Sequence, residues 1–147
     1  MKIHIGGLNS HPFLWIKVTN PENGKGIIAY ALIDTGATYN AFPAECASRL
    51  GHNLKSMSPK TICTANNKTK AYPHTSKVEV LGVFANGYPD KDKILYSLPE
   101  QRIDYTEGLG QFLLGQNNFL SEFVLTIDYP KKSFSIRHPF FAKKKKS

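Results

Sequence analysis

The feature that most restricts how this chain can fold is an uncharged apolar run, residues 27–33, that ends on Asp34. The run holds three isoleucines and a tyrosine, which predicts a strand buried on both faces. A carboxylate at the end of such a strand must either take up a proton or be held ionised by hydrogen-bond donors. Gly36 lets backbone N–H groups approach Asp34, and Thr35 carries a hydroxyl that can also donate. The sequence therefore predicts a carboxylate in a specialised setting.

Three interpretations of Asp34-Thr35-Gly36 are open at this point. In the first, the segment is a turn in which Asp34 bonds to its own backbone. The second is a phosphate-binding loop, which needs several glycines and a lysine that are absent here. The third is an aspartate that performs acid–base chemistry. This third interpretation gains weight from a second motif farther along the chain.

That second motif is an apolar strand, residues 112–114, which stops at Gly115 and is followed by a short helix opened by Asn117. The two motifs, in this order and separation, resemble the retropepsin-like aspartic proteases, which are single-lobed relatives of the pepsins. In that family a strand ends in Asp-Thr/Ser-Gly-Ala, a flap hairpin follows, and an apolar-apolar-Gly segment crosses behind the catalytic loop. The resemblance spans residues 13–137. The form Asp-Thr-Gly-Ala-Thr is similar to non-viral members.

The resemblance implies a closed, barrel-like, all-β fold with one or two short helices and the activity of an aspartic endopeptidase. Peptide hydrolysis by this route needs two carboxylates about 3 Å apart that share one proton, one to activate water and one to protonate the carbonyl oxygen. The chain has one Asp-Thr-Gly motif. We therefore expect an isologous homodimer in which Asp34 of each chain contributes to one active site on the two-fold axis. No cofactor or metal is expected.

The same resemblance assigns roles to neighbouring positions. Thr35 is similar to the residue whose hydroxyl bonds across the dimer axis, and Gly36 to the residue whose backbone faces the substrate. Leu114 is a candidate wall of a substrate subsite. The residues expected to support the catalytic loop are Thr35, Gly36, Ala37 and Thr38, and those of the supporting segment are Leu113, Leu114 and Gly115.

Residues 60–72 predict a hairpin, with strands at 60–64 and 69–72 and a tight turn at 65–68. Asparagine tolerates positive φ, so the turn chemistry is reasonable. By position the hairpin resembles the flap, which closes over an extended peptide and bonds to its backbone. An ordinary surface hairpin is the alternative. The expected flap residues are Asn66, Asn67, Lys68 and Thr69.

One departure from the family pattern concerns Thr38 and Gln116. Retroviral members often place an acid and an arginine at these positions, and the two pair. Here a neutral hydrogen bond is expected in place of the charged pair. Residues 2–5 and 133–141 are expected to form strands of a dimer interface, by analogy alone.

The rest of the chain predicts many short strands separated by turns, as in an all-β domain. The expected elements are a hairpin of 13–18 with 25–33, a helix of about two turns from Pro43 to Gly51, strands at 76–84, 93–98, 123–128 and 133–137, and a loop at 99–110.

Length and charge set the remaining bounds. The 147 residues are expected to form one domain, residues 1–142, with a lysine-rich tail at 143–147. Of the net charge of +8, seven positive charges lie in residues 131–147, and the other residues hold 12 basic and 11 acidic side chains. Such a tail can bind nucleic acid or an anionic surface, but a solvated terminus is the simpler interpretation. No stretch reaches the length of a membrane span.

Other chemistries find little support. The five histidines show no metal-binding spacing, and each is expected at the surface or in a loop. Cys46 and Cys63 match no redox or nucleophile signature and are expected to be small buried residues, as in a protein of the reducing cytoplasm. A non-catalytic binding or dimerisation module with the same fold, and a nucleic-acid binder that uses its tail, remain as alternative functions.

Overall fold

The computed structural model describes residues 2–4, 11–63 and 67–139. Within these residues, fourteen elements follow one another. They are β1 (Lys2–His4), β2 (Phe13–Thr19), β3 (Gly26–Ile33), β4 (Ala41–Pro43), α1 (Cys46–Arg49), η1 (Leu54–Ser56), β5 (Lys60–Cys63), β6 (Lys68–Val83), β7 (Pro89–Ser97), β8 (Gln101–Thr106), β9 (Phe112–Leu114), η2 (Leu120–Glu122), β10 (Val124–Asp128) and β11 (Ser133–Arg137).

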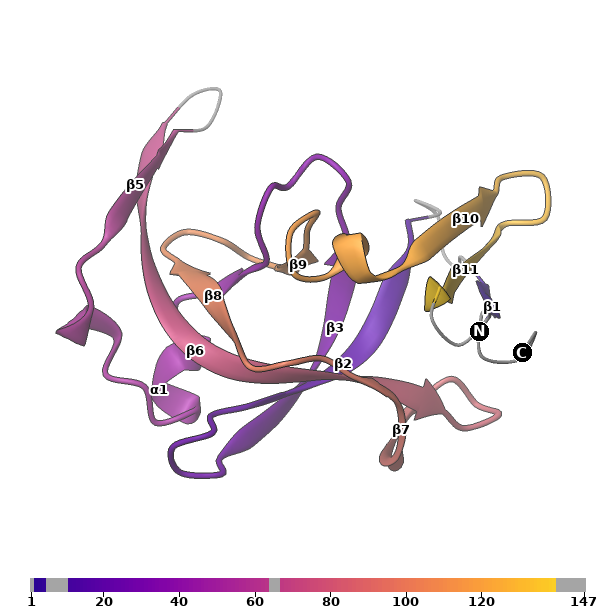
Figure 1. Ribbon diagram of the computed structural model, residues 1–147, viewed down its shortest axis with the longest axis horizontal. Coiled ribbons are helices and arrows are strands. Elements are labelled where there is room, and N and C mark those ends of the chain that lie inside the picture. Colours follow the sequence, from indigo (N-terminus) through magenta and orange to yellow (C-terminus); the bar gives the residue numbers. More distant parts are fainter. Residues whose placement is uncertain (1, 5–10, 64–66, 140–147) are drawn as a thin grey trace.

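The main sheet curves until it closes on itself. Its strands are ordered β2-β3-β9-β4-β8-β6-β5, and β6 also pairs with β2, so six strands form a closed ring. β5 and β7 attach to the two ends of the long strand β6. In Figure 1 the β5–β6 hairpin, the loop after β3 and the β10–β11 hairpin rise on the same side of the molecule. The predicted all-β fold is confirmed.

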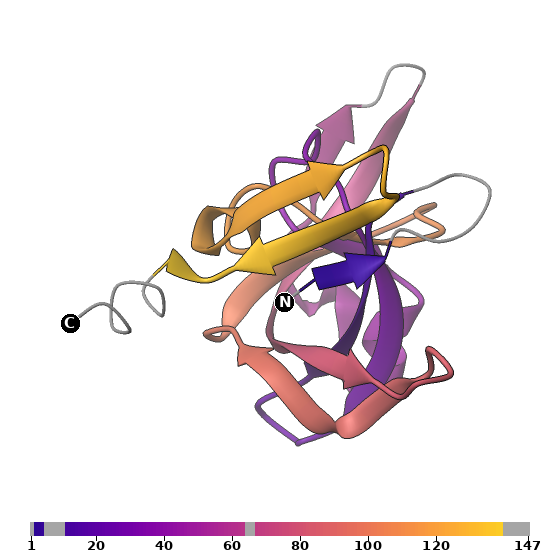
Figure 2. The same ribbon diagram turned by 90° about the vertical axis from the view of Figure 1, so that its right-hand side faces the viewer.

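A second, three-stranded sheet has the order β1-β11-β10. Figure 2 shows these strands side by side across one side of the ring. Phe134 and Ile136 of β11 are buried in the common hydrophobic core, which ties this sheet to the rest of the fold. The first and last strands thus pair within one chain. Their part in a dimer interface stays a prediction, and residues 5, 140 and 141 of those expected strands lie outside the described residues.

The hairpin of β2 with β3 forms as predicted, with Phe13 opposite Leu32 and Thr19 opposite Gly26. The prediction that the second strand is buried on both faces is wrong, because Ile28 and Tyr30 are 42% and 48% exposed while alternate residues face the core.

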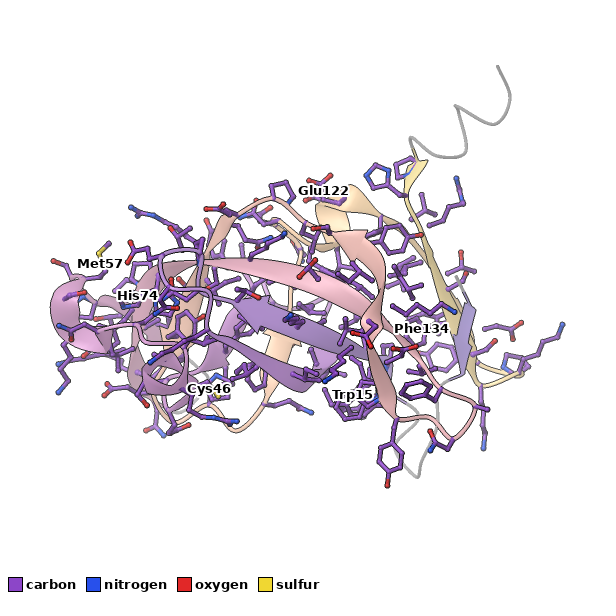
Figure 3. All side chains as sticks on the ribbon, turned by 90° about the horizontal axis from the view of Figure 1, so that it is seen from below. Trp15, Cys46, Met57, His74, Glu122 and Phe134 are labelled. Atoms are coloured by element: carbon purple, nitrogen blue, oxygen red, sulfur yellow. The ribbon has the colours of Figure 1, made fainter. Side chains whose placement is uncertain are left out.

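Aromatic rings, rather than another layer of the chain, cover part of this outer face. The rings of Phe13 and Trp15 lie 4.7 Å and 4.6 Å from the ring of Tyr30. In Figure 3 Trp15 lies in the half of the molecule that holds Phe134, away from His74.

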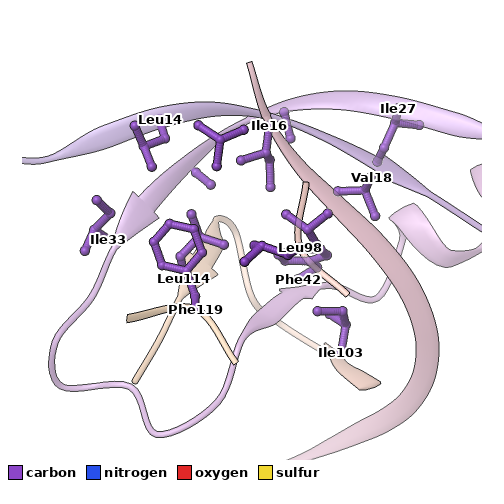
Figure 4. Packing of buried hydrophobic residues seen from close by; sticks show 14 of the residues in the cluster. Leu14, Ile16, Val18, Ile27, Ile33, Phe42, Leu98, Ile103, Leu114 and Phe119 are labelled. Carbon is purple, nitrogen blue, oxygen red and sulfur yellow. The ribbon is translucent and has the colours of Figure 1, made fainter. Parts of the chain in front are cut away.

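The inner faces of the ring make up the core. In Figure 4 the side chains of Leu14 and Ile16 on β2 point toward Leu114 of β9 and toward Phe119. All four are almost fully buried, and full burial of each such side chain stabilises the fold by about 1.5 to 3 kcal/mol. β2 is thereby packed against β9, which also pairs directly with β3, the strand that ends just before Asp34.

Two strands differ from the sequence prediction. Residues 68–83 form one strand, β6, where two were expected, because Pro73 does not interrupt it. β5 begins opposite Ala71 and does not reach Pro73, so Pro73 has β8 alone as its paired neighbour, and a proline is tolerated where one side of a strand is unpaired. The expected loop at 99–110 contains β8, whose buried polar residues hid the strand pattern.

The helices are shorter than predicted. Pro43 ends β4 instead of opening a helix, and α1 has one turn. Gly51 does stop the helical segment, with φ of 73°. The helix expected from Asn117 is the 3-10 helix η2, which starts at Leu120. Among the described residues, no helix combines the length and apolar character that crossing a membrane requires.

Candidate active site

Asp34 directly follows β3, and backbone hydrogen bonds define its position. The Asp34 N–H donates to the carbonyl of Leu114 at 2.9 Å, so the strand before Gly115 anchors the carboxylate-bearing residue. The N–H of Gly36 donates to Asp34 Oδ1 at 2.9 Å, and the N–H of Ala37 donates to the Asp34 carbonyl at 3.1 Å. The segment is therefore a turn in which Asp34 bonds to its own backbone. A turn of this kind does not exclude acid–base chemistry, because it supplies a donor to the carboxylate.

The loop that holds Asp34 is exposed at its apex. Asp34 is half-buried, while Thr35 and Gly36 at the apex are exposed. Among the described residues, Asp34 takes part in no ion pair. In one chain the carboxylate therefore lies at a surface.

Gly115 crosses directly behind the loop. A Cβ atom on this residue would lie 2.6 Å from the Ala37 carbonyl oxygen and 2.7 Å from that of Tyr39. Only glycine fits so close to backbone atoms. The next two N–H groups, of Gln116 and Asn117, donate to the carbonyls of Ala37 and Thr38 at 2.8 Å and 2.9 Å. The segment 114–117 therefore restrains the loop along its length, and the supporting role expected for Leu113, Leu114 and Gly115 stays a prediction.

Asn40 is a buried residue of the site that the sequence analysis missed. Its side chain is 2% exposed, and its Oδ1 accepts a hydrogen bond from the Gly115 N–H at 2.7 Å. Its Nδ2 donates to Gln101 Oε1 at 2.6 Å, and its carbonyl accepts from the N–H of Asp104 at 3.1 Å. A single side chain thus joins the loop, the crossing segment and β8. The available signal was an asparagine just before the apolar strand Ala41–Pro43.

The expected hydrogen bond between Thr38 and Gln116 is replaced by another. The side-chain Nε2 of Gln116 donates to the carbonyl of Thr35 at 2.6 Å, and the Thr38 side chain is exposed. The glutamine side chain is long enough to bond to Thr35 at the apex of the loop instead of to Thr38. It thereby restrains the residue next to Asp34 without a charged group.

A cleft of about 800 Å³ opens between this loop and the β5–β6 hairpin. Leu113 lines it, whereas Leu114 is fully buried in the core, so the prediction that Leu114 walls a subsite is wrong. Successive residues of a strand point to opposite faces, and β9 turns Leu113 toward the cleft.

Of the predicted flap residues, Asn66 lies outside the described residues. The lining comprises Gly36, Ala37, Thr38, Tyr39, Ala41, residues 60–63, Asn67, Lys68, Thr69, Asp104, residues 106–109 and Leu113.

Two charged side chains meet in this cleft. Lys60 Nζ lies 2.8 Å from Asp104 Oδ2, and it also lies 4.6 Å from the centre of the Tyr39 ring. The side chain of Asp104 is 7% exposed and that of Lys60 is 46% exposed. The cleft is therefore not uniformly apolar.

A second polar cluster lies near α1 and η1. His52 Nε2 and Tyr105 Oη lie 3.1 Å and 2.6 Å from Ser76 Oγ, and the rings of His52 and His74 are 4.8 Å apart. Burial, followed by the charge of His74, lowers the pKa of His52. Burial raises the pKa of Tyr105 to about 12. His74 is buried within β6, so the prediction of surface or loop positions for all histidines is wrong.

The two cysteines differ in exposure. Cys46 is buried, and burial raises the pKa of its thiol. Cys63 is exposed on β5, which corrects the prediction that it is buried. Within the described part of the chain, no group of three or more histidines, cysteines or acids could hold a metal ion.

Comparison with known proteins adds a family and a fold. A family model described as "gag-polyprotein putative aspartyl protease" matches residues 23–121, a span that includes Asp34 and Gly115. A solved structure of a retropepsin-like aspartic protease from Rickettsia conorii is 24% identical, with a TM-score of 0.59, and the match covers 93% of this chain and 97% of that one. The EIAV protease in complex with the inhibitor HBY-793 is 12% identical, with a TM-score of 0.47, over 76% of this chain and 88% of that one. A search of curated proteins finds no match.

Proposed function

The chain belongs to the retropepsin-like aspartic protease family, and from this premise we propose that it is an aspartic endopeptidase in which Asp34 of two identical chains forms the catalytic pair. The observation that carries the proposal is the position of Asp34. Its carboxylate follows a core strand, accepts a backbone N–H and lies in a loop fixed from behind by Gly115. A side chain held in this way has its geometry set before substrate binds.

The requirement for two chains follows from the chemistry. Water activation and protonation of the peptide carbonyl need one ionised and one protonated carboxyl group in close proximity. The chain contains one Asp-Thr-Gly motif, and its loop apex at Thr35 and Gly36 is exposed. A two-fold axis next to this apex would bring a second Asp34 to the first, and the apparent pKa values would then belong to the pair.

In this proposal the peptide substrate binds in the cleft. It runs between the loop residues 36–39 and the hairpin residues 67–69. An extended peptide lying there can form backbone hydrogen bonds on both sides, in the manner of an added strand. Each chain of a dimer would supply one such half-site, so the substrate is an unfolded segment or a peptide.

The first test replaces Asp34 by Asn, with Asp92→Asn on the exposed part of β7 as the matched control. Cleavage of an unfolded protein should be lost in Asp34→Asn and kept in the control, while circular dichroism and mass stay unchanged in both. If the wild type cleaves no unfolded protein between roughly pH 3 and pH 8, the proposal fails and a non-catalytic module with this fold remains.

A mixing experiment tests the shared site. When wild-type and Asp34→Asn chains are combined in equal amounts and allowed to exchange, about a quarter of the dimers contain two intact aspartates. The activity per wild-type chain should therefore fall by about half. An activity that is independent of the added Asp34→Asn chain, together with a monomeric mass in sedimentation, would show that one chain acts alone.

A further inference from the structure

The starting observation is a charged pair at the base of the β5–β6 hairpin. Lys60 begins β5 opposite Ala71 of β6, and Ala71 in turn lies opposite Thr106 of β8. Asp104 is two residues before Thr106 and so shares its face of β8. Both of these β8 residues line the cleft, and the ammonium of Lys60 reaches Asp104 at 2.8 Å. The pair therefore forms a polar floor at one end of the cleft.

Stability alone does not explain this pair. The residues on the opposite face of β8, Ile103 and Tyr105, are fully buried in the core, whereas Asp104 carries its charge at 7% exposure. Removal of a charge from water is costly, and apolar side chains of similar volume often stabilise a fold equally well or better. Ligand clefts hold a small number of placed polar groups that orient the ligand, so a buried carboxylate that lines this cleft is a candidate for ligand recognition.

The position of the ammonium is restrained from two sides. Asp104 holds Lys60 by the ion pair, and the ring of Tyr39 lies 4.6 Å from Lys60 Nζ. A cation close to an aromatic ring is attracted to the negative face of the ring. A lysine ammonium has three N–H donors, and a carboxylate has two oxygens that accept. A donor and an acceptor are thus presented side by side to the cleft.

We infer that this floor is a subsite for a carboxamide side chain, glutamine or asparagine, of the peptide substrate. The amide oxygen accepts from Lys60, and the amide N–H donates to Asp104, so both members of the pair keep a partner. A charged substrate side chain would meet one opposite and one like charge, and an apolar one would strip water from both groups without replacing its hydrogen bonds. The inference rests on the proposed function, because it requires a peptide in the cleft.

The test uses a peptide that the wild type cleaves, resynthesised with each amino acid at every position around the cut bond. At one position glutamine or asparagine should exceed methionine or leucine by about tenfold in kcat/KM, as expected where a site loses hydrogen-bond partners. Lys60→Met leaves Asp104 alone and should shift that preference to arginine and lysine. Asp104→Asn leaves Lys60 alone and should shift it to glutamate. Lys77→Met removes an ion pair with Glu79, and neither of these residues lines the cleft. This control should leave the profile unchanged.

A binding measurement separates this inference from the proposed function. Asp34→Asn protein should bind the glutamine-bearing peptide about tenfold more tightly than its methionine analogue, and Lys60→Met added to Asp34→Asn should abolish the difference. If the wild type cleaves nothing but this difference in binding is present, catalysis fails and the subsite stands. If the wild type cleaves and neither variant alters the preference at any position, the subsite is overturned and the protease stands. Equal binding of the two peptides also overturns the subsite.

Discussion

The Asp34 loop and the histidine cluster are two polar regions that the fold holds in different ways. The loop is fixed by hydrogen bonds from backbone groups, Asn40 and Gln116, none of which changes its charge with pH. The cluster is held by side-chain bonds between His52, Ser76 and Tyr105, two of which titrate. The bonds from Asn40 and Gln116 therefore do not change with pH, whereas the cluster couples the stability of the fold to pH.

The largest expected effect comes from Gly115→Ala at the loop. The added Cβ would lie 2.6 Å from a backbone oxygen, so the loop and the crossing segment must separate. We expect a loss of about 3 kcal/mol in the free energy of unfolding and loss of peptidase activity, measured by urea denaturation and by cleavage assay. Gly110→Ala is the matched control, because a Cβ there has no neighbour within 4 Å. Equal stability of the two variants would show that the loop tolerates movement.

Asn40→Ala tests the neutral side chain at the centre of the same region. The change removes the acceptor of the buried Gly115 N–H and the donor to the amide oxygen of Gln101. The free energy of unfolding should fall by about 2 kcal/mol, and kcat should fall while KM changes little, because the loop that carries Asp34 loses its register. Asn86→Ala at an exposed turn should alter neither quantity by a comparable amount. A change confined to KM would place Asn40 in substrate binding instead.

Tyr105→Phe moves the test to the histidine cluster. Loss of the hydroxyl that bonds Ser76 should cost about 1 kcal/mol with little change in kcat. Because the pKa of Tyr105 is raised to about 12 from an ordinary 10.0, the folded protein disfavours its ionised form. The stability that the phenol contributes is present below pH 10 and is lost as the pH rises through 12. Ultraviolet titration of the folded wild type should show a tyrosine ionising at this high pH, which disappears in Tyr105→Phe and persists in the exposed control Tyr129→Phe.

The smallest expected effect is that of His52→Gln on the dependence of stability on pH. The pKa of His52 is lowered from its ordinary 6.5, so the unfolded chain takes up a proton at a higher pH than the folded one. Stability should therefore decline as the pH falls below 6.5, and His52→Gln should flatten this decline. The difference should stay under about 1 kcal/mol, because solvent screens the half-exposed ring. His11→Gln, on an exposed histidine, should keep the wild-type slope. An unchanged slope in His52→Gln would remove the contrast between the two regions.

The sequence predicted the loop and its crossing segment because both depend on local rules. Asp34 had to end a strand, and Gly115 had to be glycine for backbone to pass backbone. Leu114 was predicted to face the substrate in place of Leu113, because the sequence does not show how the pairing of β9 with β3 orients the side chains of β9. Asn40 was missed for a related reason, because its partners at positions 101 and 115 are distant in the chain.

The missed strand β8 shows a different limit. Buried strands are recognised by apolar residues, but Asp104 and Thr106 are buried polar residues that face the cleft. In the sequence, polar residues at these positions are typical of a loop. The same polarity that hid the strand identifies the subsite proposed above, so the failure of the pattern falls on a candidate functional position.

One long strand links the hairpin to the ring. The 16 residues of β6 begin beside β5, and from Ala71 onward they pair with β8, β2 and β7. The pairs that close the ring, of β6 with β8 and with β2, start at Ala71 and continue toward the end of β6. They therefore do not depend on the length of the β5–β6 arm, which extends in the other direction from Ala71. We therefore expect the ring to keep its strand pairing when the length of this arm is changed.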